Sequence, residues 1–488
     1  MLLIGATVVS YVFYGPYYSP DTVNYFNFSK NLFDQNPWSA IYSPFYPFLL
    51  HCLSLLPSQS LFRGAHFLIL IQYALDLFFL YRLARISSQY YRFSLESRHT
   101  FILLILIVFH SWWSYRMFTW AHADASFYTL LIAWFYFMAN YQLKASIINL
   151  LIISILAAAM IWVKLNALAL VLFFGLLLFI DKNKFKWLIP LFFTFISYVT
   201  YRLCFPTNAF ENEQPTHTFL NYLSIGSLEL LWNNLGAFFQ AALGFFVSDV
   251  VTSYIPQFVA GMGGILLLVS LIYIAYKEWK RGIRLSSFFI LVGLAFLLCQ
   301  LAFQQMIQFE EINYRTLFPF FLGGSWLLWI KLISLGRNSS VPIFTLCLMI
   351  TLHTITGHFW LWQRQDVNSL FEVEKLVNTE LLTKLQSVQD HEMLQDALWF
   401  SDYPVKLALL MDDPFVTHYA PEAVFLQGKR RAVTLQEKQR SMEAVKESLL
   451  KGEAVLVLFG EDQRLMTFAQ REGLLIMKYP DGVVLYKR

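Results

Sequence analysis

The sequence predicts an α-helical polytopic membrane protein with about eleven transmembrane helices and a small C-terminal α/β domain outside the membrane. Three observations predict it. The 488 residues are 57% hydrophobic and only 14% charged, with a mean hydropathy of +0.51, whereas soluble domains are nearer a quarter charged. Apolar stretches of about 20 residues recur, and each can cross the hydrocarbon core as a helix. Residues 363–488, in contrast, are as charged as an ordinary soluble domain.

Composition also excludes several classes of protein. The apolar stretches lack the alternating pattern of an outer-membrane barrel. The net charge is +4, but no basic patch indicates a nucleic-acid partner. The four cysteines have no metal-ligand or disulfide spacing, so isolated thiols are expected, with a Cys52–Cys204 bridge left open. Residues 1–13 are apolar without a basic start, which favours a short first span over a cleaved signal.

The expected spans follow the apolar stretches. They lie at about 1–14, 62–82, 100–116, 124–142, 145–163, 165–181, 186–204, 256–276, 285–305, 317–335 and 341–361. Segment 226–248 is also apolar, but polar residues interrupt it, which favours an interfacial or re-entrant helix. Residues 1–362 therefore form a transmembrane domain with a long first outer loop (15–61) and a second outer loop (205–255). Residues 363–488 form a separate domain.

Cations assign the two sides of the membrane. With eleven spans, the loops that share one side carry most of the basic residues: Arg82, Arg85, Arg92, Arg98, Lys144, Lys182, Lys184, Lys186, Lys277, Lys280, Arg281, Arg284, Lys331 and Arg337. The positive-inside rule makes this side cytoplasmic. We therefore expect a multi-pass protein of a bacterial inner (plasma) membrane, with a cytoplasmic N-terminus and an extracytoplasmic C-terminal domain.

The C-terminal segment mixes short apolar strands with helical stretches. Strands are expected at 398–400, 454–459 and 483–486, and helices at 370–385 and 436–450. This mixture predicts a small α/β domain. It contains no Gly-rich loop that would cradle a nucleotide, so its expected role is structural or substrate-shaping.

Two aspartates stand out in the outer loops. Asp21 starts a run with helical periodicity, where an acidic side chain meets free amides and the positive end of the helix dipole. On the helix signals alone, a plain N-cap aspartate is the stronger interpretation of Asp21. Asp124 lies where an outer loop enters a long apolar span, and ionisable groups there are costly unless they face a cavity or a partner. The second aspartate shifts the balance towards a functional site.

Two cations accompany them. Lys164 interrupts the apolar stretch 145–180 at an outer hairpin, where its alternative role is to reach the interface as an amphipathic side chain. Arg315 lies just before the tenth span, and its alternative role is an ion pair with Glu310 or Glu311. Arginine suits forked, charge-assisted bonds to phosphate oxygens, and an outer-side arginine runs against the usual cation bias.

Loops from four parts of the chain thus bring two carboxylates and two cations to one face of the membrane. A carboxylate can take a proton from a hydroxyl nucleophile, and cations can hold a phosphate as it leaves. This combination fits group transfer from a phosphorylated lipid. It also fits a transporter for an anionic solute.

Five short motifs occur in order along residues 1–335. They are Asp21 with Tyr25, Tyr42-Ser-Pro44-Phe-Tyr46-Pro47, His122-Ala-Asp124, Lys164 within an apolar hairpin, and Tyr314-Arg315-Thr-Leu-Phe-Pro319. In this order the chain resembles the GT-C superfamily of membrane glycosyltransferases, particularly the branch with protein O-mannosyltransferases and bacterial aminoarabinose transferases. It departs from that pattern in having one aspartate in the first loop instead of an acidic pair, and in the reversed Arg–Tyr order at 314–315.

The resemblance implies a polyprenyl-phosphate-linked sugar as donor and an inverting single displacement. It makes Asp21 the base, gives Asp124 a role in orienting acceptor or donor, and assigns the lipid phosphate to Arg315 and Lys164. The implied substrate-binding residues are Tyr25, Tyr46, His122 and Tyr314. A divalent metal on Asp21 or Asp124 is left open. The implied partners are membrane lipids and a lipid, glycan or protein acceptor, with no nucleic acid.

Two other functions remain as alternatives. A multi-pass transporter or flippase for an anionic or lipid-linked solute would need sites near the bilayer midplane, and often internal repeats. The sequence has no clear repeat, and Asp76, the one acid in the second span, is interpreted as a local polar contact. A structural membrane subunit would leave the elaborate first loop unexplained.

Overall fold

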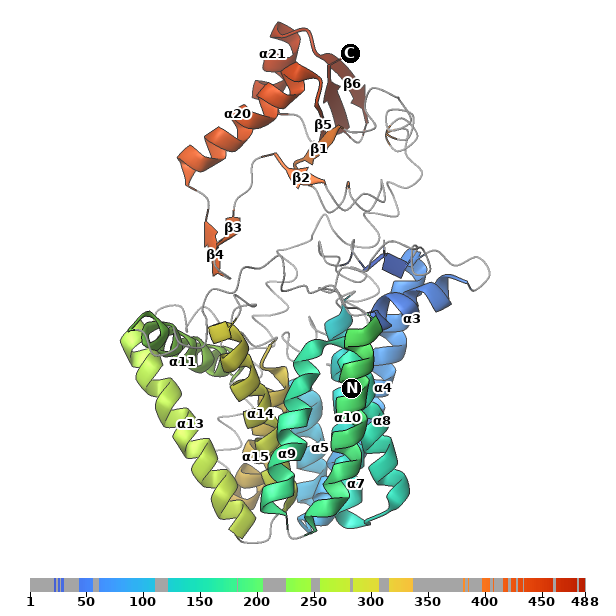
Figure 1. Cartoon of the computed structure of the whole chain (residues 1–488), viewed down its shortest axis with the longest axis vertical. Helices are drawn as coiled ribbons and strands as arrows, with labels where there is room; N and C mark the ends of the chain where they lie inside the picture. Colours follow the sequence, from blue (N-terminus) through green and yellow to red (C-terminus); the bar gives the residue numbers. More distant parts are fainter. Residues whose placement is uncertain are drawn as a thin grey trace.

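The structure is a computed structural model, and it describes the following residues: 22, 25–26, 28–29, 44–55, 61–109, 122–181, 183–204, 225–246, 255–280, 284–306, 316–336, 381, 385, 397–403, 407, 416–419, 423–426, 429–432, 434–459, 462–480 and 482–487. Within these ranges the chain forms a helical bundle and, at one end of it, a smaller α/β domain (Figure 1).

The bundle is built from long apolar helices. They are α4 (Leu61–Tyr90), α5 (Leu95–Phe109), α7 (Ala123–Leu143), α8 (Ile147–Val163), α9 (Ala169–Ile180), α10 (Leu188–Cys204), α13 (Gln257–Lys280), α14 (Arg284–Met306) and α15 (Phe318–Gly336). Short 3₁₀ turns η1 (Leu165–Leu168) and η2 (Lys184–Trp187) precede α9 and α10. Each helix overlaps an expected span, although α4 runs eight residues past its expected end and α5 starts five residues before its expected start. The expected spans 1–14 and 341–361 lie outside the described residues.

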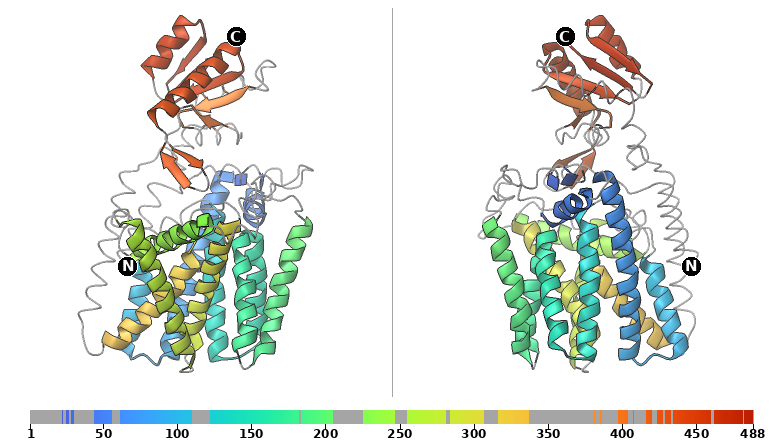
Figure 2. Two further views of the ribbon diagram at one scale, coloured as in Figure 1. Left: turned by 60° about the vertical axis from the view of Figure 1, so that its left-hand side comes forward. Right: turned by 90° about the vertical axis from the view of Figure 1, so that its right-hand side faces the viewer.

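Successive helices of the bundle run in opposite directions, so their connections alternate between two ends (Figures 1 and 2). The end that is remote from the α/β domain carries these basic residues: Arg85, Arg92, Lys144, Lys184, Lys277 and Lys280. The other end carries the starts of α7 and α15 and the end of α8. These six cations therefore share one end of the bundle, whereas Arg63, Lys164 and Arg202 lie at the other end.

The exposed surface of the bundle is apolar. Four of the described helices are long and apolar enough to cross a membrane: Gly64–Tyr90, Lys184–Cys204, Gln257–Lys280 and Leu285–Ala302, with shorter apolar helices at Ile147–Val163 and Leu165–Ile180. On α10 the buried residues are Pro190, Thr194, Ser197 and Tyr201, while Phe192 and Phe195 are exposed. A helix whose polar groups face inward and whose aromatic groups face outward fits a lipid environment.

Helix α11 (Ile225–Phe246) differs from its neighbours. It lies crosswise at the end of the bundle near the α/β domain and packs on α13 (Figure 1). The packing is close, because a Cβ added at Gly264 would overlap the carbonyl oxygen of Leu235, and one at Gly261 would overlap the Trp232 ring. The crosswise course agrees with the interfacial helix expected at 226–248.

Helix α3 (Phe45–Ser54) lies at the same end of the bundle as α11, outside the row of long helices (Figure 2). It belongs to segment 15–61, the predicted first outer loop, together with the described helical residues between 22 and 29. The His51 Nδ1 lies 2.8 Å from the carbonyl oxygen of Ser29, which links the two parts of this loop. Cys52 in α3 and Cys204 at the end of α10 are free, exposed thiols, as expected.

The C-terminal domain contains a five-stranded mixed sheet in the order β2-β1-β5-β7-β6. Its strands are β1 (Leu398–Ser401), β2 (Thr417–His418), β5 (Ala454–Leu458), β6 (Leu475–Tyr479) and β7 (Gly482–Tyr486). β1 pairs in parallel with β2 and β5, whereas β7 pairs antiparallel with β5 and β6. A separate hairpin joins β3 (Ala423–Leu426) and β4 (Lys429–Ala432). The α/β class predicted for this segment is confirmed for these residues.

Two layers cover the sheet. Helices α20 (Leu435–Lys451) and α21 (Gln463–Arg471) pack on the face that carries Leu456 and Leu458 of β5. The opposite face, with Val455 and Val457, packs on the buried side chains of Leu381, Leu385 and Leu407. Because alternate residues of a strand point to opposite faces, β5 is buried along its whole length and forms the core of the domain.

Candidate functional site

The candidate site begins where α7 enters the bundle. Asp124 occupies the first turn of this helix, and its side chain is 2% exposed. His122, in extended conformation just before the helix, accepts a hydrogen bond from the Asp124 N–H at its Nδ1, at 3.1 Å. The same Nδ1 lies 3.4 Å from Asp124 Oδ2. His122 therefore caps the N-terminus of α7 and helps to hold the Asp124 carboxylate at the start of this helix.

Lys164 reaches this carboxylate from the neighbouring hairpin. Helix α8 ends at Val163, and Lys164 adopts an extended backbone before η1 begins. Its ammonium group donates a hydrogen bond to Asp124 Oδ1 and forms an ion pair with it, with the lysine side chain 18% exposed. A buried charge is stable only when it is paired. Lys164 therefore pairs directly with Asp124 at the end of the bundle where α7 begins.

Aromatic rings from the first outer loop cover the pair. Tyr25 lies edge-on to the His122 ring at a centroid distance of 5.3 Å and edge-on to Tyr46 at 5.0 Å. Tyr46 is fully buried in α3, and its hydroxyl has no hydrogen-bond partner among the described residues. Burial raises the pKa of Tyr46, so its hydroxyl remains protonated and can donate to a ligand.

The first turn of helix α15 packs on α7 beside the site. Thr316 and Leu317 are buried, and the Phe318 ring lies 4.2 Å from that of Tyr128, one helical turn below Asp124. The chain that follows residue 315 is thus anchored beside the site helix. Arg315 and Tyr314 themselves lie outside the described residues, as does Asp21. Thr22, next to Asp21 in the sequence, is fully buried.

Five of the eight predicted site residues are therefore brought together. They are Asp124, Lys164, His122, Tyr25 and Tyr46, from the first outer loop, α3, α7 and the hairpin after α8. Sequence reasoning placed Asp124 and Lys164 on one side of the membrane but missed their direct ion pair. The available signal was weak: each residue is a single charge at the end of an apolar segment.

Further polar residues lie in the bundle next to the site; of these, sequence reasoning singled out Asp76 alone. The Gln72 side-chain amide on α4 donates to the Ser126 hydroxyl on α7. One turn further along α4, Asp76 is buried against Thr129 of α7. The Gln72–Ser126 bond links the two helices next to Asp124, whereas both Asp76 oxygens are buried without a hydrogen-bond partner among the described residues.

Metal ligation was left open for Asp21 or Asp124. The described residues contain no group of three or more His, Cys, Asp or Glu side chains that could hold a metal ion. One Asp124 oxygen is bound by the lysine ammonium and the other lies near His122. Within the described part of the chain, Asp124 is thus placed to meet a cation or a hydroxyl group, and no second carboxylate accompanies it.

The fold and site together define a helical membrane protein with a buried carboxylate–ammonium pair under an aromatic cover, at the end remote from its basic loops. No family model matches the chain, and no curated protein matches it in sequence. Two solved structures are similar to it. One is ArnT from Cupriavidus metallidurans bound to undecaprenyl phosphate, at 12% identity and a TM-score of 0.44, covering 99% of this chain and 97% of that one.

The other is the oligosaccharyltransferase of Archaeoglobus fulgidus in its apo form, at 12% identity and a TM-score of 0.46, covering 93% of this chain and 69% of that one. Both are GT-C glycosyltransferases, the superfamily that the five motifs resemble. At TM-scores below 0.5 these likenesses carry no weight in assigning a reaction, which depends on the residues of the site.

Proposed function

We propose that the chain is an integral membrane glycosyltransferase that moves a sugar from a polyprenyl-phosphate donor to an acceptor hydroxyl on the extracytoplasmic side. The observation that supports it most is the Lys164–Asp124 pair, buried beneath Tyr25 and Tyr46 at one end of the bundle. Such a site places a cation and a buried tyrosine hydroxyl at the level where a lipid headgroup lies.

Lys164 and Arg315 would hold the phosphate of the donor. Lys164 is 18% exposed while it pairs with Asp124, so its ammonium can also face a ligand. Arg315 precedes α15, whose first turn packs on the site helix through Phe318 and Tyr128. Two cations on the departing phosphate stabilise the charge that it gains as the bond to the sugar breaks.

Asp21 would act as the base. The acceptor oxygen attacks the anomeric carbon and its proton passes to the Asp21 carboxylate. The bond from that carbon to the phosphate oxygen breaks, and its electron pair leaves with the polyprenyl phosphate. One displacement from the face opposite the leaving group inverts the anomeric configuration. Thr22 and Tyr25 follow Asp21 by one and four residues and are both buried. Tyr25 also packs on His122.

Asp124 would orient the reactants. It has Lys164 on one oxygen and His122 beside the other, so its own position is fixed. A fixed carboxylate can accept hydrogen bonds from sugar or acceptor hydroxyls and hold them in line for attack. Tyr46, with its buried hydroxyl, and Tyr314 would contribute further contacts to the substrate.

The basic end of the bundle gives the orientation. Because short loops rich in Lys and Arg remain in the cytoplasm, the site and the C-terminal domain would face the outside of a bacterial inner membrane. Polyprenyl-phosphate sugars presented in the outer leaflet would then reach the site from the bilayer. The acceptor would be a lipid, a glycan or a protein.

Purified protein assayed against a panel of polyprenyl-phosphate sugars tests the proposal. Wild-type protein is expected to release polyprenyl phosphate from one donor, and Asp21→Asn to lose this activity while it folds and inserts normally. Glu447→Gln, an exposed carboxylate of α20 that pairs with Lys451, is the matched acid-to-amide control and should retain full activity. Transfer by Asp21→Asn at the wild-type rate would exclude Asp21 as the base.

A transporter or flippase for an anionic or lipid-linked solute is the second candidate, favoured by Asp76. This carboxyl group is 1% exposed within α4, and buried acids in spans commonly belong to ion pathways. A transporter would show solute movement driven by a pH gradient in proteoliposomes, and Asp76→Asn would abolish it. Sugar transfer that survives Asp76→Asn, without gradient-driven movement, would favour the enzyme.

A further inference from the structure

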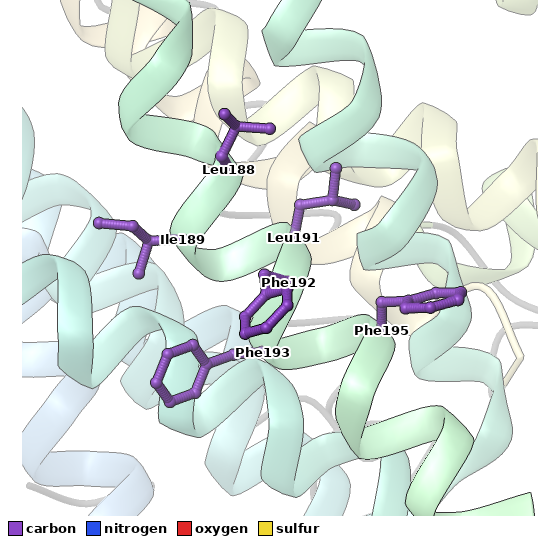
Figure 3. A pocket seen from close by; sticks show the side chains of 6 residues that line it. All are labelled: Leu188, Ile189, Leu191, Phe192, Phe193 and Phe195. Atoms are coloured by element: carbon purple, nitrogen blue, oxygen red, sulfur yellow. The ribbon is translucent and has the colours of Figure 1, made fainter.

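A hollow of about 620 Å³ lies on the outer surface of α10, in the half of the helix near the basic end of the bundle. Figure 3 shows the side chains that line it, which project from successive turns of this one helix. All six are apolar: Leu188, Ile189, Leu191, Phe192, Phe193 and Phe195. The hollow therefore suits a hydrocarbon chain and offers no hydrogen-bonding group to a polar ligand.

The face that carries the hollow points away from the bundle. Thr194 and Ser197 of α10 are buried, and Ser197 donates to the carbonyl oxygen of Ala158 in α8. Phe192 and Phe195 are 61% and 54% exposed. The hollow is thus open to the membrane and remote from Asp124, so it is separate from the candidate site.

Cations surround the end of α10 at which the hollow begins. Lys184 and Lys186 lie in η2, directly before Leu188. Lys144 directly follows Leu143, the last residue of α7. The end of α7 lies beside η2, because the Tyr141 and Trp187 rings are 5.8 Å apart. An apolar hollow near ammonium groups is complementary to an anionic lipid: the hollow suits the acyl chain and the cations suit the headgroup.

The three lysines differ in their partners. Lys186 pairs with Asp181 at 3.2 Å, and the same carboxylate accepts a hydrogen bond from the Trp187 ring N–H. Lys144 and Lys184 are exposed, and no carboxylate among the described residues forms an ion pair with either. The charge of Lys186 is therefore compensated, whereas Lys144 and Lys184 leave two positive charges at the same end of the bundle as the hollow.

From these features we infer that α10 and η2 form a binding site for an anionic glycerophospholipid of the membrane. Its phosphate would lie between Lys144 and Lys184, and an acyl chain would follow α10 into the hollow. The lengths agree: the twelve residues from Lys184 to Phe195 span roughly 18 Å, at about 2.0 Å per residue in the 3₁₀ turn η2 and 1.5 Å in α10, which is about one leaflet of a 30 Å hydrocarbon core. A polybasic segment at a membrane surface attracts such lipids.

Native mass spectrometry of the purified full-length protein tests this site. The protein is titrated with phosphatidylglycerol and, separately, with phosphatidylcholine of the same acyl chains. Wild-type protein should retain phosphatidylglycerol preferentially. Each lysine near an anionic headgroup contributes a factor of about five in affinity, so Lys144→Gln/Lys184→Gln should weaken phosphatidylglycerol binding about 30-fold. Both lysines are exposed, so the double variant should fold.

A matched control separates this site from a general charge effect. Lys277→Gln/Lys280→Gln removes two exposed cations at the same end of the bundle, on α13, and should leave phosphatidylglycerol binding unchanged. Phe192→Ser should weaken the binding of both lipids while preserving the preference for phosphatidylglycerol. Equal retention of the two lipids by wild-type protein would overturn the inference. So would equal losses of phosphatidylglycerol binding in the two double variants.

Discussion

Removing Lys164 should leave the Asp124 carboxylate buried without its cation. The Asp124 side chain is 2% exposed and Lys164 is its ion-pair partner. Loss of one partner of a buried pair costs about 3 to 5 kcal/mol, because the remaining charge is uncompensated. The His122 Nδ1 lies 3.4 Å from Asp124 Oδ2 but accepts the Asp124 N–H, so this nitrogen brings no proton to that oxygen. We therefore expect Lys164→Met to lower the free energy of unfolding of the bundle by about 3 kcal/mol or more.

A double-mutant cycle measures this effect. Wild type, Lys164→Met, Asp124→Asn and the combination of both are compared by denaturant unfolding in mild detergent, followed by near-UV circular dichroism of the aromatic-rich bundle. The double variant carries no buried charge and should lie within about 1 kcal/mol of wild type. Lys164→Arg keeps the pair and is the conservative control. A Lys164→Met protein as stable as wild type, or a double variant as unstable as Lys164→Met, would refute the buried-pair reasoning.

Three further predictions follow from local contacts. His122→Ala should destabilise the bundle by about 1 kcal/mol and reduce transfer, whereas His122→Asn, which keeps an N-cap acceptor, should restore most of the stability in thermal unfolding. Gly264→Ala should destabilise by about 1–3 kcal/mol, because its Cβ overlaps backbone of α11, while Gly175→Ala, which meets open space in α9, should not lower the unfolding midpoint. Burial raises the pKa of Asp402 in the folded protein, despite the hydrogen bond from the Phe459 N–H. The stabilising contribution of this carboxyl group is therefore complete below its ordinary pKa of 3.8, and it is lost as the pH rises through the pKa of the folded state. Asp402→Asn should therefore slow hydrogen exchange of the β1–β5 amides relative to wild type at neutral pH, with no difference below about pH 3.8.

Hydropathy predicted the bundle well because each span is a continuous apolar stretch. The expected span 285–305, for example, became α14, Arg284–Met306. The end of α4 was less predictable: the expected span stops at residue 82, but the helix continues to Tyr90. Charged residues such as Arg82 and Arg85 lower the hydropathy and so end the predicted span, but they do not end the helix. The helix ends where Arg92 adopts a positive φ of 51°, which a hydropathy window does not detect.

The site could be predicted as a set of residue types but not as a set of contacts. The sequence indicated that Asp124 and Lys164 lie on one side of the membrane, since charges are costly inside it. Their ion pair joins residues 40 positions apart and depends on how α7 packs on α8. The contact between Tyr25 and His122 likewise depends on how the first outer loop folds over the bundle. Such long-range geometry has no local sequence signal.

Oriented proteoliposomes test the central claim most directly, namely that this end of the bundle transfers sugar from a polyprenyl phosphate. The C-terminal domain lies at the same end as Asp124 and Lys164 (Figures 1 and 2), so protease access to it reports the orientation of each population. The labelled donor and a water-soluble acceptor are added from outside to preformed vesicles. Transfer confined to molecules with an accessible C-terminal domain is the predicted result. Transfer by molecules that expose the basic end instead, or no transfer in either orientation with any donor, would contradict the account.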